Sequence, residues 1–217
     1  GHGCITEGPN NTWWVFYTSI FCYHYRFERR IGMDPIGIDE NGELFCPEVT
    51  ETPQYAPGVL EKPELGNSAG LLPLTFMQIP TVSSAAPGRD GIYAQDDSVL
   101  TWWQPEADDP EKTITVPLDT DKGYRVESVR IIWRDVGMET LEGIDPGPFQ
   151  YVVEYLSPED NKTWKLLVDA SQNDRDLCVD YRTFPPVIAT DLRLRILGSP
   201  KGIEPGLVSF PAFGNPV

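Results

Sequence analysis

The sequence predicts an all-β protein, and three observations support this fold class. Glycine and proline account for 19 and 21 of the 217 residues, and both interrupt helices. Hardly any stretch repeats apolar residues at the i, i+3, i+4, i+7 spacing of an amphipathic helix. Short apolar or alternating runs recur instead, each bounded by turn residues. Such runs are typical of antiparallel strands.

Residues 1–50 predict about four short antiparallel strands. A strand near Cys4 is followed by the turn sequence GPNN and then by TWWVFYTSIFCYHY, whose aromatic and β-branched residues suit a strand covered on both sides. In IGMDPIGIDENGELF, Asn41 and Gly42 lie between apolar residues, which is the strongest short signal for a β-hairpin. Asp34 and Asp39 precede these turn signals and are interpreted as turn carboxylates.

Residues 51–78 and 79–217 differ in pattern. The first segment is rich in proline and shows little alternation, so it is predicted to be a connector. The second contains recurring strand signals, of which DLRLRIL is the clearest: its leucines and isoleucine alternate with Arg193 and Arg195. Around eight such strands predict a two-sheet sandwich of the jelly-roll type.

The charge of the chain limits its partners. Seventeen basic residues stand against 33 acidic ones, for a formal net charge of −16. This field repels the phosphates of nucleic acids and the anionic headgroups of membranes. No run approaches the roughly 20 apolar residues of a membrane-spanning helix. We therefore expect neither nucleic acid nor membrane as a partner, and the compartment stays open, with a slight preference for the cytoplasm.

The cysteines are widely spaced in the sequence. Cys4, Cys22, Cys46 and Cys178 form no C-x-x-C pair and have no histidine nearby in a zinc pattern. We interpret them as buried free thiols.

The segments GHGCITEGPNNTWWVFYT and RRIGMDPIGIDENGELF resemble the end of the five-bladed β-propeller of glycoside hydrolase family 43. The resemblance implies that residues 1–50 are the remnant of a last propeller blade and that His2 corresponds to a histidine of the central channel. No acidic residue here matches the family's catalytic carboxylates. The chain alone is therefore not expected to be catalytic, and its parent is expected to be an arabinofuranosidase or xylosidase type enzyme.

The segments YAQDDSVLTWWQP and VSFPAFG resemble the first loop and the last strand of discoidin-like domains, also called family 32 carbohydrate-binding modules. The resemblance implies a structural Ca²⁺ site formed by Asp96, Ser98 and Thr101. Asp97 stands where glycine is usual, and Ser209 stands where a glutamate closes the site. A loop held by hydrogen bonds alone is the alternative.

The same resemblance suggests where sugar would bind. Trp103 is expected to be a core anchor, and Trp102 is expected to point outward and stack on a sugar ring. In the long loop WRDVGMETLEGIDPGPF, Arg134 and Asp135 could bond hydroxyl groups or pair with each other, and Tyr181 is a further candidate.

Two functions follow from these expectations. In the favoured one, the chain is the noncatalytic C-terminal part of a family 43 type glycosidase, and its module binds arabinan or xylan type glycans. The alternative is a domain that braces the propeller and has no ligand of its own. Without neighbouring blades, residues 1–50 would have unpaired strand edges. We therefore expect these residues to pack on the sandwich or to pair with a second copy of the chain.

Overall fold

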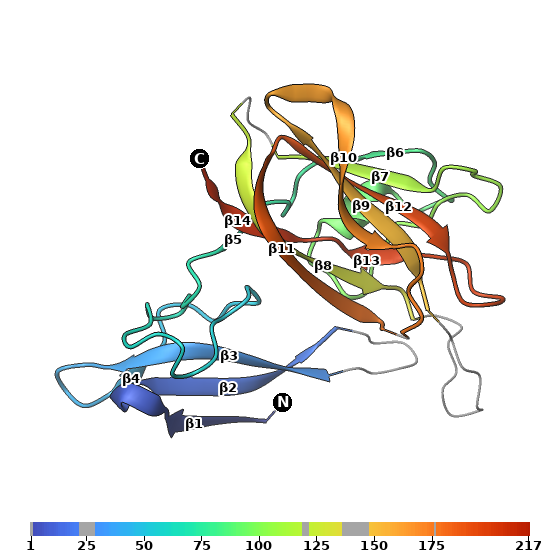
Figure 1. Ribbon diagram of the computed structural model, residues 1–217. Coiled ribbons are helices and arrows are strands. Elements are labelled where there is room, and N and C mark those ends of the chain that lie inside the picture. The colour runs from blue at the N-terminus through green and yellow to red at the C-terminus, as the bar shows by residue number, and fades with distance from the viewer. Residues whose placement is uncertain (1, 22–28, 119–121, 136–147, 176) are drawn as a thin grey trace. The chain divides into compact units, whose positions relative to one another are not determined.

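The structure is a computed structural model that describes residues 2–21, 29–118, 122–135, 148–175 and 177–217. Contacts within the chain divide it into two units, whose strands are labelled in Figure 1. Unit 1 comprises Gly1–Ile20 and Arg29–Leu72, and unit 2 comprises Phe21–Glu28 and Pro73–Val217. Most of the proline-rich segment therefore belongs to unit 1.

Unit 1 contains a four-stranded antiparallel sheet with the strand order β1-β2-β3-β4. Its elements are β1 (Gly3–Glu7), the 3-10 helix η1 (Pro9–Asn11), β2 (Trp13–Ile20), β3 (Arg29–Ile38) and β4 (Leu44–Phe45). The short antiparallel strands predicted for residues 1–50 are thus confirmed.

The turn between β3 and β4 confirms the hairpin predicted at Asn41 and Gly42. The N–H group of Gly42 donates to the carbonyl of Asp39 at 3.1 Å, and Gly42 has a φ of +82°, a conformation that glycine adopts without a steric cost. The carboxylate of Asp39 accepts bonds from the N–H groups of Asn41 and Glu43, each at 2.8 Å. Its interpretation as a turn carboxylate is therefore confirmed.

Asp34 has a different role from the one predicted. Its side chain is fully buried in β3 and accepts hydrogen bonds from the Tyr17 hydroxyl at 2.7 Å, the Thr50 hydroxyl at 2.9 Å and the Gln54 amide at 2.8 Å. Gln54 also donates to the carbonyl of Gly66 at 3.1 Å. A buried carboxylate needs such partners because burial removes its hydration. The interpretation of Asp34 as a turn carboxylate is wrong, and the network holds the segment after β4 against the sheet.

The sheet of unit 1 is less covered than the sequence predicts. Trp14 is 1% exposed, but the other residues of β2 are half-buried or exposed. Every residue of β1 is exposed, and Ile31 on β3 is 80% exposed. The expectation that the aromatic strand is covered on both sides is wrong for this unit.

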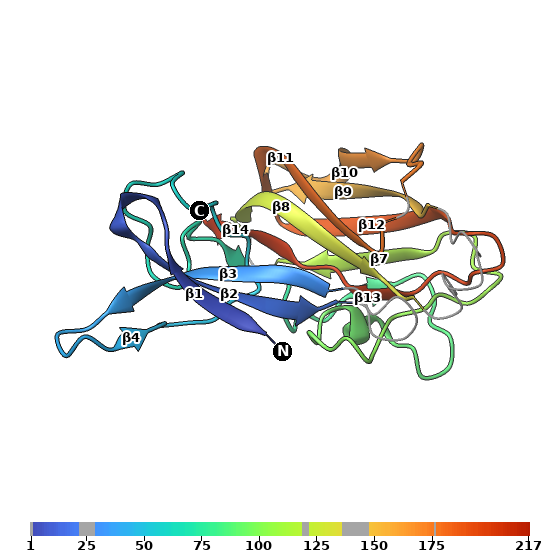
Figure 2. The ribbon, with the colours of Figure 1, turned by 90° about the horizontal axis from the view of Figure 1, so that it is seen from below.

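Unit 2 contains two five-stranded sheets that face each other, as Figures 1 and 2 show. One has the strand order β10-β9-β12-β7-β6, and the other has the order β11-β8-β14-β5, with β13 also paired to β8. The elements are β5 (Leu72–Pro73), β6 (Thr81–Val82), the 3-10 helix η2 (Gly91–Ala94), β7 (Thr113–Pro117), β8 (Tyr124–Trp133), β9 (Gln150–Ser157), β10 (Asp160–Ala170), β11 (Val179–Ala189), β12 (Asp191–Gly198), β13 (Leu207–Ser209) and β14 (Ala212–Pro216). The predicted all-β class and the β-sandwich are confirmed.

No helix in the described part of the chain is long and apolar enough to cross a membrane.

The two sheets of unit 2 enclose one hydrophobic core. On β12, Leu192, Leu194 and Ile196 belong to this core. Arg193 and Arg195 lie on the other face and pair with Glu154, as the alternation predicted. The largest buried aromatic residues of the core are Trp103, Trp133, Phe149, Tyr151 and Phe210. Each such side chain contributes on the order of 1.5–3 kcal/mol when it is fully buried.

The cysteines differ from the prediction. Cys178 is buried and forms a disulfide bond, so its interpretation as a free thiol is wrong. Cys4 and Cys46 are free, as predicted, but Cys4 is exposed and Cys46 is half-buried. Cys22 lies outside the described residues. Spacing along the sequence could not reveal the bond of Cys178, because a disulfide depends on how close two cysteines lie in space and how their side chains are oriented.

Candidate functional site

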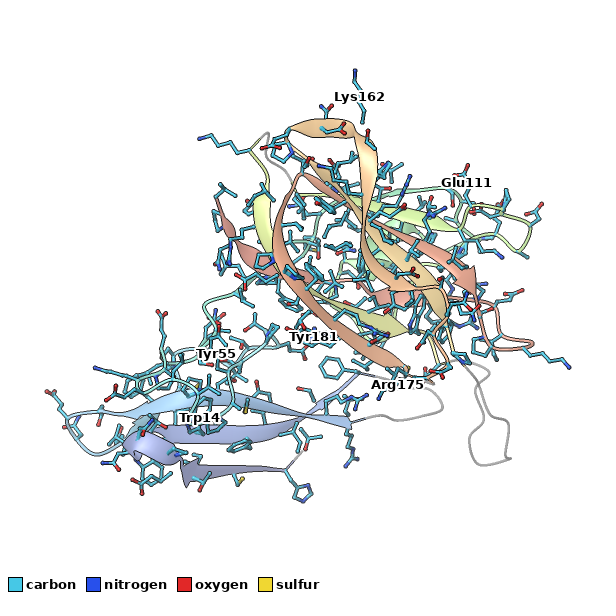
Figure 3. The ribbon with its side chains drawn as sticks, viewed as in Figure 1. Trp14, Tyr55, Glu111, Lys162, Arg175 and Tyr181 are labelled. Carbon is cyan, nitrogen blue, oxygen red and sulfur yellow. The ribbon has the colours of Figure 1, made fainter. Side chains whose placement is uncertain are left out.

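Several loops of unit 2 meet at the end of the sandwich where β8 ends and β11 begins. There the N–H group of Trp133 donates to the carbonyl of Cys178 at 2.9 Å, and the end of β12 pairs with the start of β9. We call this the loop end. Figure 3 labels Arg175 at the loop end and Lys162, in the hairpin of β9 and β10, at the opposite end.

Trp102 lies at the loop end and is buried beneath two arginines. Only 7% of its surface is exposed. The Cζ atom of Arg89 lies 3.4 Å from the centroid of the indole, and that of Arg134 lies 4.8 Å from it. The expectation that Trp102 points outward is therefore wrong, because guanidinium groups from other segments cover its ring. Trp103 is fully buried, so its role as a core anchor is confirmed.

Gln104 links the groups around this indole. Its Oε1 atom accepts hydrogen bonds from Arg134 Nη1 at 2.6 Å and from Trp102 Nε1 at 3.2 Å. Its Nε2 atom donates to Glu204 Oε2 at 2.7 Å, and its backbone N–H donates to the carbonyl of Arg89 at 3.3 Å. We call Arg89, Trp102, Gln104, Arg134 and Glu204 the arginine–indole cluster. It presents cationic, amide and carboxylate groups at one place on the loop end.

Two predicted sugar-binding residues lie outside this cluster. Asp135 is only 2% exposed, so little of its carboxylate is accessible to a ligand. Tyr181 is 44% exposed, but it lies on β11 opposite Arg130 of β8, and Figure 3 labels it there. Most of the long loop that was predicted to carry a site, residues 136–147, lies outside the described residues.

Sequence reasoning missed Arg89, Gln104 and Glu204. Gln104 and Glu204 are 100 positions apart in the chain. Arg89 and Glu204 lie outside the segments quoted for a resemblance, and Gln104 lies within YAQDDSVLTWWQP without having been singled out. Only the fold brings them together.

A second polar arrangement lies beside the loop that follows β10. The hydroxyl of buried Tyr151 donates to Asp180 at 2.6 Å, and Asp180 also accepts a 2.8 Å bond from Arg182. Burial raises the pKa of Tyr151, and the hydrogen bond to Asp180 raises it further. Arg182 lines a pocket of about 370 Å³ together with Asp169, Ala170, Ser171, Gln172, Asn173, Asp174 and Arg175.

The loop predicted to bind Ca²⁺ is closed by its own hydrogen bonds. Asp96 accepts from the N–H group of Ser98 at 3.0 Å and from the hydroxyl of Thr101 at 2.8 Å. Thr101 also donates to the carbonyl of Ser98 at 3.3 Å. Among the described residues, no group of three or more histidine, cysteine or acidic side chains could hold a metal ion. One carboxylate, a carbonyl and a hydroxyl fit part of the oxygen shell that Ca²⁺ requires.

His2 precedes β1 in unit 1 and is exposed. Its backbone carbonyl accepts a bond from the Thr18 hydroxyl at 3.4 Å.

Comparison with known proteins shows similarity at the level of structure. No protein-family model matches the chain, and no curated protein matches it. Chitosan-binding module 1 of a chitosanase/glucanase from Paenibacillus sp. IK-5 matches with a TM-score of 0.52 and 21% identity, covering 66% of this chain and 99% of the module. Module 2 of the same enzyme, solved with chitotriose, matches with a TM-score of 0.53 and 18% identity, covering 65% and 99%.

A third similar structure is the module CBM32-4 of a family 89 glycoside hydrolase from Clostridium perfringens, solved with GlcNAc-α-1,4-galactose. It matches with a TM-score of 0.54 and 14% identity, covering 68% of this chain and 96% of the module. Unit 1 is too small to supply such a share, so the match falls mainly on unit 2. Unit 2 therefore has the discoidin-like β-sandwich fold of these carbohydrate-binding modules.

Proposed function

We propose that unit 2 is a carbohydrate-binding module and that the arginine–indole cluster is its binding site. The observation that carries this proposal is the convergence of Arg89, Gln104, Arg134 and Glu204 around one indole at the loop end. The fold shared with solved carbohydrate-binding modules supports it.

The chemistry of the cluster suits sugars. Hydroxyl groups both donate and accept hydrogen bonds, and the cluster offers the N–H groups of two guanidiniums together with the carboxylate of exposed Glu204. Gln104 holds Arg134 and Glu204 in fixed positions, which reduces the entropy lost on binding. The ligands proposed from the sequence are arabinan or xylan type glycans.

The experiment is an NMR titration of the whole chain with oligosaccharides of arabinan, xylan, galactan and chitosan. We expect at least one series to shift resonances of the cluster, and Arg134→Ala to weaken that binding roughly tenfold, because a hydrogen bond to a charged group is lost. Arg125→Ala is the matched control, since Arg125 pairs with Glu127 near the start of β8, away from the loop end. If no glycan shifts a cluster resonance at high millimolar concentration, the proposal fails.

We further propose that unit 1 is the last blade of a family 43 type propeller and that the chain is the noncatalytic C-terminal part of such a glycosidase. Support comes from exposed apolar residues that further protein would cover, such as Ile5, Ile31 and Val49, which are 46%, 80% and 63% exposed. His2 then corresponds to the channel histidine of the parent. The chain should release no chromophore from chromogenic arabinosides or xylosides. Measurable release that is abolished by substituting an acidic residue of the chain would contradict this proposal.

The alternative of a bracing domain is not supported on the sheet that contains β12. A brace would use an apolar sheet face, but the outer face around β12 contains the ion pairs of Arg193 and Arg195 with Glu154. Such a charged face does not suit a dry contact with another domain.

A further inference from the structure

Arg89 is the cation of the arginine–indole cluster that is held most closely against the ring. Its Cζ atom lies 3.4 Å from the centroid of Trp102, which is the distance of a stacked contact between two planar groups. The indole is itself buried, so it provides a rigid support. The contact with this ring therefore restricts the positions that the Arg89 guanidinium can take before any ligand arrives.

Several other arginines pair with carboxylates, whereas Arg89 contacts an aromatic ring. Arg125 pairs with Glu127, Arg182 pairs with Asp180, and Arg193 pairs with Glu154. Within the described ranges of the chain, no carboxylate lies within 4.0 Å of the Arg89 guanidinium, although acidic residues outnumber basic ones by 33 to 17.

Among its own five residues, the arginine–indole cluster has two cationic side chains and one anionic side chain. It contains the guanidinium groups of Arg89 and Arg134 and one carboxylate, that of Glu204, which is bound by Gln104. A planar guanidinium binds a carboxylate through two parallel N–H···O bonds, and this geometry is stronger and more selective than a contact with a hydroxyl group. The indole is buried and both guanidiniums lie over it, so the ring is not available to stack on a neutral sugar ring.

We propose that the arginine–indole cluster selects acidic glycans and that Arg89 binds the carboxylate of a uronic acid residue through its paired N–H groups. This inference rests on the proposed carbohydrate-binding function and names the class of sugar. The net charge of −16 opposes an anionic ligand at long range, but that repulsion is screened over about 8 Å at physiological salt. At contact distance the groups of the cluster determine the preference.

The experiment compares an acidic oligosaccharide with its neutral ester and with an unrelated glycan. Calorimetric and NMR titrations of the whole chain use trigalacturonic acid, its methyl ester and chitotriose. We expect the acid to bind at least roughly tenfold more tightly than the ester, since its carboxylate adds a charged, bidentate contact, and chitotriose to bind more weakly than the acid.

Variants of Arg89 assign the effect to this side chain. Arg89→Gln should remove the preference for the acid while ester binding changes less than about twofold. Arg89→Lys keeps the charge but loses the planar fork, so it should retain only part of the preference. Arg125→Gln, on a paired arginine far from the loop end, should behave like the unaltered chain. Circular dichroism checks that each variant is folded.

Each outcome decides one of the two proposals. Equal affinity for the acid and the ester, or tighter binding of chitotriose, overturns the acidic preference and leaves the carbohydrate-binding function standing. A preference for the acid that survives in both Arg89 variants overturns the role of Arg89. Absence of binding by every glycan in both panels removes the proposed function and this inference with it.

Discussion

The hydroxyl group of Tyr17 donates a 2.7 Å hydrogen bond to the carboxylate of Asp34, where β2 and β3 meet the segment that follows β4. Burial raises the pKa of Tyr17, and the bond to Asp34 raises it further. The same hydroxyl bonds the carbonyl of Thr50. This pair joins the sheet of unit 1 to a segment that has almost no regular structure of its own.

Asp34→Ala should release that segment from the sheet. The substitution removes the carboxylate that accepts hydrogen bonds from Tyr17, Thr50 and Gln54. The loss of these charge-assisted bonds should cost about 3 kcal/mol. Hydrogen exchange and limited proteolysis should show faster opening between β4 and β5. Asp39→Ala in the exposed turn is the control and should leave this protection unchanged. Equal protection in both variants would mean that the network contributes little.

Trp102→Ala should destabilise unit 2 by about 3–5 kcal/mol, as expected for the loss of a buried tryptophan. The indole is 7% exposed and packs with Ile132, Cys178 and Val208. Trp102→Phe keeps most of that packing but loses the bond from Nε1 to Gln104, so its cost should be near 1 kcal/mol. Urea denaturation measures both. A Trp102→Ala variant as stable as the unaltered chain would show that the ring is not part of the packed structure.

Because of Asp109, the free energy of unfolding should depend on pH in the acidic range. Burial alone would raise its pKa, but hydrogen bonds from Ser83, Ser84 and the backbone outweigh burial and lower the pKa from 3.8 to about 2. The folded state thus favours the ionised form, so this stabilisation is complete above about pH 3.8 and is lost as the pH falls towards 2.

Asp109→Asn tests that dependence. The variant should be less stable than the unaltered chain at pH 7, and the difference should shrink steadily between pH 4 and pH 2. Thermal melts across this range measure it, with Asp108→Asn on the exposed neighbour as the control. A difference that stays constant with pH would show that Asp109 titrates normally.

We propose that the loop of Asp96 binds Ca²⁺ weakly, in the millimolar range of other sparsely coordinated sites. Millimolar Ca²⁺ should raise the melting temperature of unit 2 and EDTA should lower it, and Asp96→Asn should abolish both effects. Asp97→Asn is the matched control, since Asp97 has a φ of +57° that asparagine tolerates. Melting that is indifferent to Ca²⁺ and EDTA would leave a loop closed by the bonds of Ser98 and Thr101 alone.

The sequence predicted the sandwich because alternation is a local property. Leu192 and Leu194 lie in the core, and Arg193 lies on the other face, as period-two spacing requires. The hairpin at Gly42 was predictable for the same reason, since a turn depends on adjacent residues.

The candidate site was only partly predictable because its residues come from separate loops. Resemblance pointed to Trp102 and Arg134, which the structure brings together. The same resemblance predicted that Trp103 is buried and that Trp102 points outward, but the guanidinium of Arg89 covers the Trp102 ring from a separate segment of the chain. The burial of Asp34 was unpredictable for a similar reason, because its partners Thr50 and Gln54 lie beyond the next strand.

The place of β14 in its sheet has a consequence for synthesis. This strand, formed by Ala212–Pro216, lies between β8 and β5 rather than at an edge, and the Leu74 N–H group bonds the Ala212 carbonyl at 2.8 Å. A ribosome that adds about 5–20 residues per second needs on the order of ten seconds to pass from β8 to β14. β11 is made within that time and pairs with β8, but the other edge of β8 stays open until β13 and β14 follow. Completion of this sheet is therefore a late, nonlocal event, and the open edge of β8 can pair elsewhere until then.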